Sequence, residues 1–236
     1  NGFDKAQGMA TSYPEFYEYL VNNVKDGSSL LEKMKSAITE DTVLWSDMES
    51  GLGEFTAITD NAEEFDDFYF ELNSHLQNYL KIQNDKFTPN SKLKNKFIDD
   101  FVNCAKYLGA LDKGRYDTFM NRHSFSSKDI YVMTLNYTNT LEKILDYNTS
   151  TGVFTKNLNL YNNLQGIIHI HGQLDSSIII GVDNVEQIKH REFQDNENIK
   201  DCMIKMQSNQ VMKTTRHLRC EKLIADANLI VLMGVS

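Results

Sequence analysis

The chain has few cysteines and prolines and no long apolar run. Its three cysteines, Cys104, Cys202 and Cys220, are too few and too widely spaced for a disulfide framework or a C-x-x-C metal site. Free thiols are typical of the reducing cytoplasm, and the first residues do not resemble a signal peptide, so we expect a cytoplasmic protein. The longest apolar run, near 229–233, is far shorter than the ~20 residues that cross a bilayer, so no transmembrane helix is expected.

Basic residues are in the minority as well. Lysine and arginine number 24 against 33 aspartates and glutamates, which gives a net charge of −9. Such a chain repels phosphate backbones, and a short mixed stretch such as 92–96 is typical of a solvated helix face, so nucleic-acid binding is disfavoured. With 236 residues, 41% of them hydrophobic, the composition is that of a globular protein with one large domain or a domain with an insertion.

Helical periodicity dominates the first half of the chain. Only two prolines occur, so helices can run long. Ser12-x-x-Glu15 has the form of a capping box and predicts a helix over about 13–24. Apolar residues recur at three- and four-residue steps from 61 to 82, and again from 93 to about 109. Aromatic stripes of this kind belong to a core far more often than to a cofactor site, and we interpret them so.

Short apolar runs bounded by polar residues follow after residue 128 and predict buried strands. They span 129–135, 166–171, 177–182 and 228–233, with helical segments along the way. Strands that alternate with helices are typical of a doubly wound parallel α/β sheet, Rossmann-like, and this is the fold class that we expect.

The helical block over 27–122 is too long for a simple β–α–β crossover, so we expect a large helical insertion subdomain there. Residues 1–26 and 123–236 then form the α/β domain. The chain opens on Asn1 with no strand before it and closes on Ser236 directly after an apolar run. We therefore expect that the first strand and a C-terminal part of this domain lie outside the sequence.

Polar clusters fall where the predicted strands end, which is where ligands bind in open α/β sheets. The clusters are Asn1–Asp4, where the missing first strand would end, Asn136–Asn139 and His171–Gly172. Glycine in the first cluster, together with Gly8, would let a phosphate approach the backbone near a helix N-terminus. A plain strand–helix turn capped by the aspartate explains the first cluster equally well, so both interpretations stay open.

Two histidines, His169 and His171, are two positions apart on one predicted strand, so we expect their side chains on the same face. Such a pair can hold zinc with a third ligand, but no further histidine or clustered carboxylate has the spacing of a metal site, and we predict none. His171 is the last residue before Gly172, at the mouth of the sheet. His169 lies one pleat deeper, and we expect it to make a buried hydrogen bond.

Several segments together resemble the AbiH family of bacterial phage-abortive-infection proteins. Their order and spacing extend from the first residue to Asp183, although Ala10 stands where the family usually has proline. The segments are Asn1-Gly-Phe-Asp-Lys-Ala-Gln-Gly-Met-Ala-Thr-Ser-Tyr13 with Phe16, Trp45-Ser-Asp-Met-Glu49 with Leu52-Gly53, Leu135-Asn-Tyr-Thr-Asn-Thr-Leu-Glu-Lys143, and Ile168-His-Ile-His-Gly-Gln-Leu-Asp175 with Gly181-Val-Asp183.

The AbiH family is in turn similar, more distantly, to sirtuin-like NAD-binding domains. This resemblance implies a sirtuin-like nucleotide-binding sheet, a catalytic pair formed by Asn136 and His171, and NAD as substrate or ligand. Asp4 and Thr138 stand where sirtuin-like chains have serine and aspartate. The residues that would hold the nucleotide are Asn1, Gly2, Phe3, Asp4, Gly8, Thr138, Gly172, Gly234 and Ser236.

Together these resemblances imply a phage-defence protein that binds NAD or a related nucleotide and hydrolyses it as a glycohydrolase. Asn136 would orient the ribose or the water, and His171 would act as the base. A nucleotide-sensing module without turnover is the alternative, and the substituted Asp4 and Thr138 favour it. We expect a nucleotide as the ligand and no membrane partner, and a homo-oligomer stays open.

A third and weaker hypothesis is a metal-dependent hydrolase. It would use His169 and His171 together with Asp175 or Asp183 as metal ligands.

Overall fold

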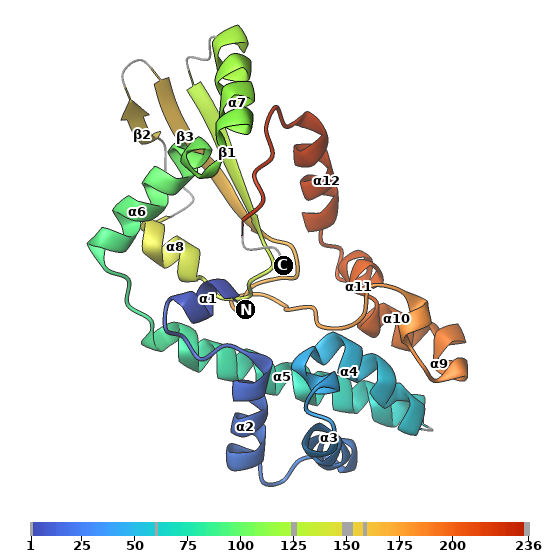
Figure 1. The fold of residues 1–236 in the computed structure, drawn as a ribbon. Coiled ribbons are helices and arrows are strands. Elements are labelled where there is room, and N and C mark those ends of the chain that lie inside the picture. The colour runs from blue at the N-terminus through green and yellow to red at the C-terminus, as the bar shows by residue number, and fades with distance from the viewer. Residues whose placement is uncertain (1, 60, 124–126, 148–152, 158–159, 234–236) are drawn as a thin grey trace.

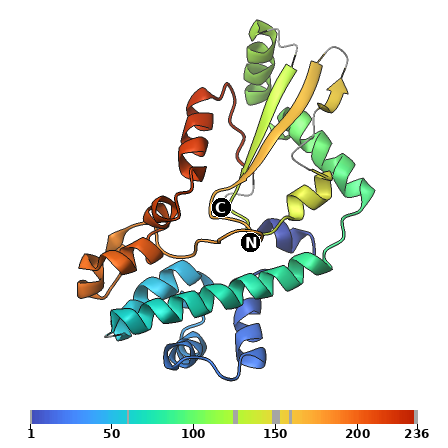
Figure 2. The same ribbon diagram turned by 180° about the vertical axis from the view of Figure 1, so that it is seen from behind.

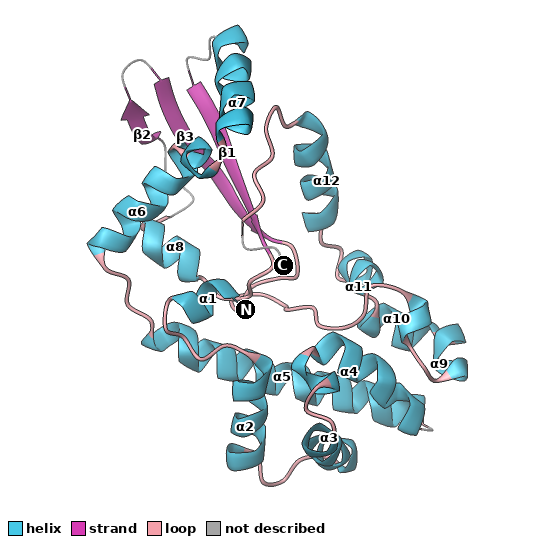
Figure 3. Cartoon of the chain, viewed as in Figure 1, coloured by secondary structure: helices cyan, strands magenta, loops and turns pink. Residues whose placement is uncertain are grey.

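The computed structural model describes residues 2–59, 61–123, 127–147, 153–157 and 160–233. Helices make up most of this part of the chain (Figure 3). A small sheet lies on one side of a helical layer that is built around the longest helix, and the C-terminal helices lie beside both (Figures 1 and 2).

Among the described helices α5, with 25 residues, is the longest. The strands are β1 (Ser127–Thr134), β2 (Val153–Asn157) and β3 (Leu160–His169). The α-helices are α1 (Gly2–Ala6), α2 (Tyr13–Asn23), α3 (Ser29–Glu40), α4 (Met48–Phe55), α5 (Ala62–Lys86), α6 (Ser91–Val102), α7 (Ala110–His123), α8 (Thr140–Leu145), α9 (Arg191–Asp195), α10 (Glu197–Met203), α11 (Lys205–Val211) and α12 (Arg216–Asp226).

Two of the predicted helices are confirmed with their N-terminal caps. The carboxylate of Glu15 accepts hydrogen bonds from the backbone N–H of Ser12 at 2.9 Å and from its hydroxyl at 2.6 Å, which fixes the start of α2. The side chain of Asn61 accepts from the N–H of Glu63 at 2.9 Å, and α5 begins there. The helix predicted over 93–109 is shorter, because α6 ends at Val102 and a 3₁₀ turn follows.

The expected doubly wound parallel sheet, sirtuin-like and Rossmann-like with a helical insertion, is wrong. The strand order is β1-β3-β2, and within the described ranges the only parallel ladder joins β1 to β3, since β2 runs antiparallel to β3. The runs at 129–135 and 166–171 are confirmed as strands, although β3 begins at Leu160 and ends at His169. The other two runs form no strand, for different physical reasons.

The apolar run at 177–182 is buried in the helical layer instead of in a sheet. Ile178, Ile179 and Ile180 are 0–1% exposed. Their carbonyl oxygens accept hydrogen bonds from side chains: Ile178 from the amide of Asn73 at 3.2 Å, Ile179 from the hydroxyl of Tyr137 at 2.9 Å and Ile180 from the hydroxyl of Tyr69 at 2.8 Å. These side chains take the place of a neighbouring strand over 178–180. Val182, at the end of the run, forms an isolated bridge with Ile204, so the run is buried and hydrogen-bonded without joining the sheet.

The apolar run at 228–233 is extended but unpaired in the described part of the chain. It leads from α12 back towards the C-terminal end of β1 (Figures 1 and 2). The side chains of residues 229–233 are 48–78% exposed. High β-propensity therefore does not produce a strand here, because propensity follows from packing against strand neighbours and this run has none.

Two hydrophobic cores hold the described residues together. The larger joins α2, α3, α4 and α5 to the segment between residues 178 and 204, with Phe16, Phe68 and Ile180 among its fully buried members. The smaller joins α8, the sheet and α6. All elements described between 27 and 122 are helical; α3, α4 and α5 share the larger core with the C-terminal part, whereas α6 packs in the smaller one. The division of the chain into two domains stays a prediction.

We predict that Tyr69→Phe destabilises the fold by about 1–3 kcal/mol, because it leaves the buried carbonyl of Ile180 without its donor. Tyr131→Phe is the matched control, since Tyr131 is 42% exposed on β1. Denaturant unfolding of both variants measures the difference. Equal stability of the two variants would show that the hydroxyl of Tyr69 does not hold the isoleucine segment.

Candidate functional site

The C-terminal ends of β1 and β3 run on side by side after their ladder ends. The N–H of Ile170 donates to the carbonyl of Thr134 at 3.0 Å, and the N–H of Leu174 donates to the carbonyl of Tyr137 at 3.0 Å. The residues between these two hydrogen bonds are the predicted catalytic positions, Asn136 on one segment and His171 on the other. The fold thus brings the backbones of the two positions to one edge of the sheet.

Asp4 of α1 anchors the N-terminus to this edge. It is fully buried, and its carboxylate accepts hydrogen bonds from the hydroxyl of Thr138 at 2.7 Å and from the amide of Asn136 at 3.5 Å. The hydroxyl of Thr140 in turn donates to that of Thr138 at 3.0 Å. Burial raises the pKa of Asp4, and the hydrogen bonds from the threonines offset this only in part.

His169 makes the buried hydrogen bonds expected of it, which confirms that prediction. Its Nδ1 lies 2.6 Å from the carbonyl oxygen of Asn136, and its Nε2 lies 2.7 Å from a carboxylate oxygen of Glu142. Burial lowers the pKa of His169, but the hydrogen bond and the charge of Glu142 outweigh burial, so the pKa is raised. The Glu142–His169 pair thus holds the peptide group of the predicted catalytic asparagine.

His171 has the opposite electrostatic environment. Burial and the charge of Lys205 lower its pKa to about 4, and Asp183 opposes this only in part. The imidazole is therefore neutral near pH 7. Because β3 ends at His169, the alternation of a strand does not extend to His171, and the charged groups around the two histidines are different ones.

The predicted glycine positions differ in the space around them. Gly2 and Gly8 are exposed, and a Cβ built on either would meet nothing within 4 Å. At Gly172, with φ of +89°, a Cβ would lie 2.0 Å from the carbonyl oxygen of Ser177. The space beside Gly172 is therefore filled by the chain itself, and this glycine permits close packing of its backbone against that of Ser177.

The other predicted nucleotide contacts fall in three different places. Phe3 packs edge-on against Phe97, with ring centroids 5.3 Å apart, and belongs to the smaller core. Thr138 is 1% exposed and bonded to Asp4. A nucleotide contact of these residues stays a prediction. Asn1, Gly234 and Ser236 lie outside the described residues.

Sequence reasoning missed Glu142 as a partner of the site. Glu142 is the only acidic residue of the Asn-Tyr-Thr-Asn-Thr-Leu-Glu segment, and its place on the first turn of α8 puts it against β3. The sequence offers one signal, the three-residue spacing between Asn139 and Glu142. This spacing is equally typical of an acidic residue in the first turn of a helix, so it does not by itself indicate a site. Contact with His169 is a tertiary fact that the spacing does not contain.

No group of three or more histidine, cysteine, aspartate or glutamate side chains in the described ranges could hold a metal ion. Both ring nitrogens of His169 are engaged by Asn136 and Glu142, so this histidine is not available as a metal ligand in this arrangement. Among the described helices, none combines the length and the apolar character needed to cross a membrane.

Comparison with known proteins gives one match. The family model described as "Bacteriophage abortive infection AbiH" matches residues 1–236, the whole chain. A search of curated proteins and a search of solved structures each found no match.

We predict that Glu142→Gln removes a pH-dependent part of the stability. A histidine with a raised pKa stabilises the fold below its unfolded value of 6.5, and this contribution is lost as the pH rises through the folded pKa. The stability difference between wild type and Glu142→Gln should therefore be larger at about pH 6 than at about pH 9. Denaturant unfolding at both pH values measures it.

The lowered pKa of His171 makes the stability depend on pH between about 4 and 6.5. This dependence is the same in wild type and in Glu142→Gln, so it does not contribute to the stability difference between them. Glu221→Gln, at an exposed position of α12, is the control and should show no such trend. A difference that is constant with pH would contradict a charged His169–Glu142 pair.

We predict that Gly172→Ala costs at least about 2 kcal/mol of stability, from its positive φ and from overlap with the carbonyl of Ser177. Gly8→Ala is the matched control, because its φ is also positive, +78°, but the space around it is open, so only the strain of about 1 kcal/mol applies. Thermal melts of the two variants test this, and equal losses would refute the packing argument.

Proposed function

This chain belongs to the AbiH family of bacteriophage abortive infection proteins, and we propose that it serves phage defence by binding NAD or a related nucleotide where β1 and β3 end and hydrolysing it. The proposal assigns the bond between nicotinamide and ribose as the one that breaks. Asn136 and His171 are the residues that carry the chemistry in this proposal.

One observation supports the proposal above the others. The carboxamide of Asn136 and the neutral imidazole of His171 belong to two adjacent backbone segments. Two backbone hydrogen bonds of 3.0 Å join these segments, one on either side of the two residues. With its pKa lowered to about 4, His171 is unprotonated near pH 7 and can accept a proton. Among the described residues the ring of His171 makes no hydrogen bond, so it is not committed to a structural role.

The surroundings of Asn136 support an orienting role. Its carbonyl oxygen is held by His169 and its amide lies against the carboxylate of Asp4, so both ends of the residue are fixed. A preorganised amide costs little to align when a ribose or a water molecule approaches. Asp4 is fully buried, so its hydrogen bond with the side-chain amide of Asn136 is shielded from water.

The reaction needs little acid catalysis, because nicotinamide leaves as a neutral molecule from a cationic group. The bond between C1′ and the pyridine nitrogen breaks, and its electron pair stays on nitrogen. A water oxygen bonds to C1′, and its proton passes to His171, which returns it to solvent. Asn136 orients the ribose or the water during this step.

The two ends of α1 are compatible with a phosphate-bearing ligand. Gly2 and Gly8 are exposed and leave open space next to the backbone. Burial raises the pKa of Asp4, and its buried carboxylate is engaged by the hydroxyl of Thr138.

Nucleotide sensing without turnover is the second candidate. The hydrogen bond between Asp4 and Thr138 favours it, because both side chains are spent on tying α1 to the loop after β1 and neither is exposed. In that case a nucleotide would be bound at the same edge, and its occupancy would be passed to the helices.

The test is incubation of the protein with NAD, with free nicotinamide and bound NAD both measured. We expect nicotinamide release, and a fall of about 10²-fold or more in Asn136→Ala and in His171→Ala. His75→Ala on α5 is the control and should keep full activity. Binding without release would favour the sensing alternative, and absence of binding would refute both.

A further inference from the structure

Arg216, the first residue of α12, brings a cationic group to the turn that follows His171. Helix α12 contacts β3 and lies beside the sheet (Figures 1 and 2). A Cβ built on Gly172 would lie 3.0 Å from Nη1 of Arg216. At the other end of the turn, Nη2 of Arg216 donates to the hydroxyl of Ser176 at 3.2 Å. The guanidinium group is thus placed against the turn 172–176, directly after the predicted catalytic histidine.

No carboxylate that the structure describes neutralises Arg216. The side chain forms no ion pair with an aspartate or glutamate in the described ranges. Asp175, which lies in the same turn, instead accepts a hydrogen bond from the side-chain amide of Asn139 at 2.8 Å. Burial lowers the pKa of Arg216, but an arginine stays protonated in proteins. The turn therefore borders a full positive charge that has no counter-charge among the described side chains.

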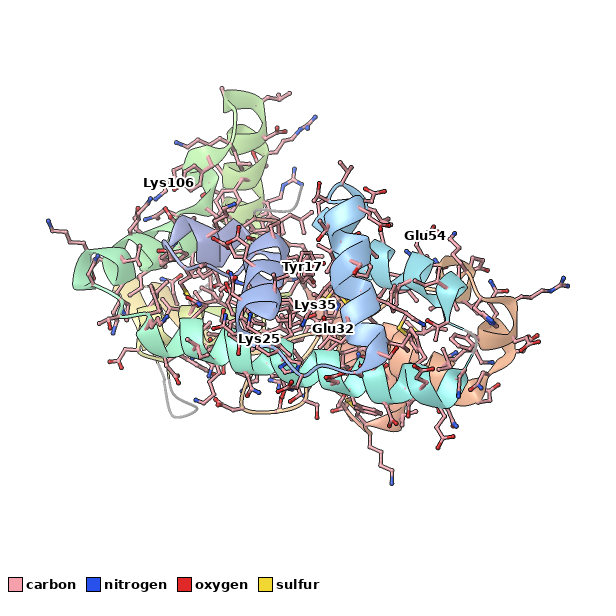
Figure 4. The ribbon with its side chains drawn as sticks, turned by 90° about the horizontal axis from the view of Figure 1, so that it is seen from below. Tyr17, Lys25, Glu32, Lys35, Glu54 and Lys106 are labelled. Atoms are coloured by element: carbon pink, nitrogen blue, oxygen red, sulfur yellow. The ribbon has the colours of Figure 1, made fainter. Side chains whose placement is uncertain are left out.

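Buried ammonium groups elsewhere in the chain are paired. Lys35 and Lys205 have side chains that are only 10% exposed. Lys35 lies 2.6 Å from a carboxylate oxygen of Glu32 on the same helix (Figure 4). Lys205 contacts the carboxylates of Glu49 and, at 3.0 Å, Asp183. The guanidinium group on α12 differs from this pattern, although a charge that is removed from water without a partner is costly.

One nitrogen of this guanidinium group is both buried and unpartnered. Nη1 of Arg216 is shielded from solvent and makes no hydrogen bond with any residue that the structure describes. Nη2 has the hydroxyl of Ser176 as its acceptor, although a guanidinium group carries several N–H donors and spreads its charge over all three nitrogens. Buried polar groups in native proteins nearly always have a partner. The arrangement therefore indicates that an anion from outside the described chain completes it.

A second unpaired arginine follows one turn later on the same side of α12. Arg219 is three residues after Arg216, so the two side chains share a helix face. A Cβ built on Gly166 of β3 would lie 3.3 Å from Nη2 of Arg219. Arg219 also has no ion pair within the described part of the chain. Two uncompensated charges on one face, in a chain with a net charge of −9, create a local positive potential that attracts anions.

We propose that Arg216 binds the phosphate of the nucleotide, namely the one carried by the ribose whose bond to nicotinamide breaks. This inference rests on the proposed function and adds the group that recognises the phosphate. His171 accepts the proton of the water that attacks C1′ of this ribose, and Arg216 is held against the next residue, Gly172. The 5′-phosphate belongs to the same sugar, so it lies on the same part of the ligand.

Arginine suits this role because its planar fork matches two oxygens of a phosphate, and such charge-assisted hydrogen bonds are strong. Arg216 is only partly buried, so a phosphate can approach the guanidinium group from its open side. Arg219 adds to the positive potential at this place. A chain with an excess of acidic residues needs such a local charge to hold a phosphorylated ligand.

The test measures the binding of two probes, nicotinamide mononucleotide and nicotinamide riboside, which differ only in the 5′-phosphate. Wild-type protein should bind the mononucleotide about 10-fold or more tightly than the riboside. In Arg216→Gln this preference should disappear, because binding of the mononucleotide weakens and binding of the riboside stays the same. Binding of NAD by Arg216→Gln should weaken by a similar factor.

Arg191→Gln is the matched control. Arg191 is also the first residue of a helix, α9, is exposed, and forms no ion pair with the carboxylates that are described. Its removal changes the net charge equally, so this variant should keep the wild-type preference for the mononucleotide. Arg216→Met guards against a folding defect in Arg216→Gln, because methionine keeps an apolar stem at this position.

Thermal melts of each variant accompany the binding measurements, so that lost binding is counted only for folded protein. If wild type binds NAD but does not prefer the mononucleotide, or if Arg216→Gln keeps the preference, the phosphate assignment is wrong and the proposed function stands. If neither variant of Arg216 folds, the arginine is a structural residue and the assignment is again wrong. If wild type binds neither NAD nor the two probes, both the assignment and the proposed function are wrong.

Discussion

The backbone of the isoleucine segment 178–180 needs hydrogen-bond donors in a place where no strand can supply them. Tyr69, Asn73 and Tyr137 supply these donors from α5 and from the loop after β1. Burying three unpaired carbonyls would cost several kcal/mol, so the course of the chain here depends on these three side chains. Because α5 carries two of them, the longest helix fixes the segment that leads from the sheet to α11.

The placement of the candidate site follows from that segment. Upstream it continues into Gly172 and His171, and downstream into Gly181 and Asp183. At both glycines the backbone of another segment approaches to a distance that no side chain would permit. The polar groups at its two ends are thus held by packing of the main chain, and this precision suits a site that must align a substrate.

The pKa values of two nearby histidines are shifted in opposite directions by their tertiary contacts. His169 and His171 have the same intrinsic pKa and both are largely buried, yet one pKa is raised and the other lowered. Glu142 faces the first histidine, whereas Lys205 lies near the second. The first is therefore suited to holding the Asn136 peptide, and the second to accepting a proton near pH 7.

Local signals in the sequence were sufficient for the features that local physics controls. The capping box of Ser12 and Glu15 predicted the start of α2, because a cap is satisfied within a few residues of itself, and apolar periodicity predicted α5. The apolar runs that became β1 and β3 were likewise found. The pairing of Asp4 with Thr138 could be anticipated only as a common location at the ends of strands, without its distance or burial.

The sequence by itself determined that the chain has the composition of a globular protein, that it belongs to the AbiH family, and that polar clusters follow the apolar runs of β1 and β3. Only the tertiary structure decided which apolar runs are strands, since 177–182 and 228–233 look alike as sequences but are buried and exposed respectively. It also decided that Glu142 meets His169 and that Lys205 joins Glu49 to Asp183. The physical reason is that hydrophobicity specifies burial and not the partner, whereas hydrogen bonds between residues that are distant in the sequence exist only after the chain has packed.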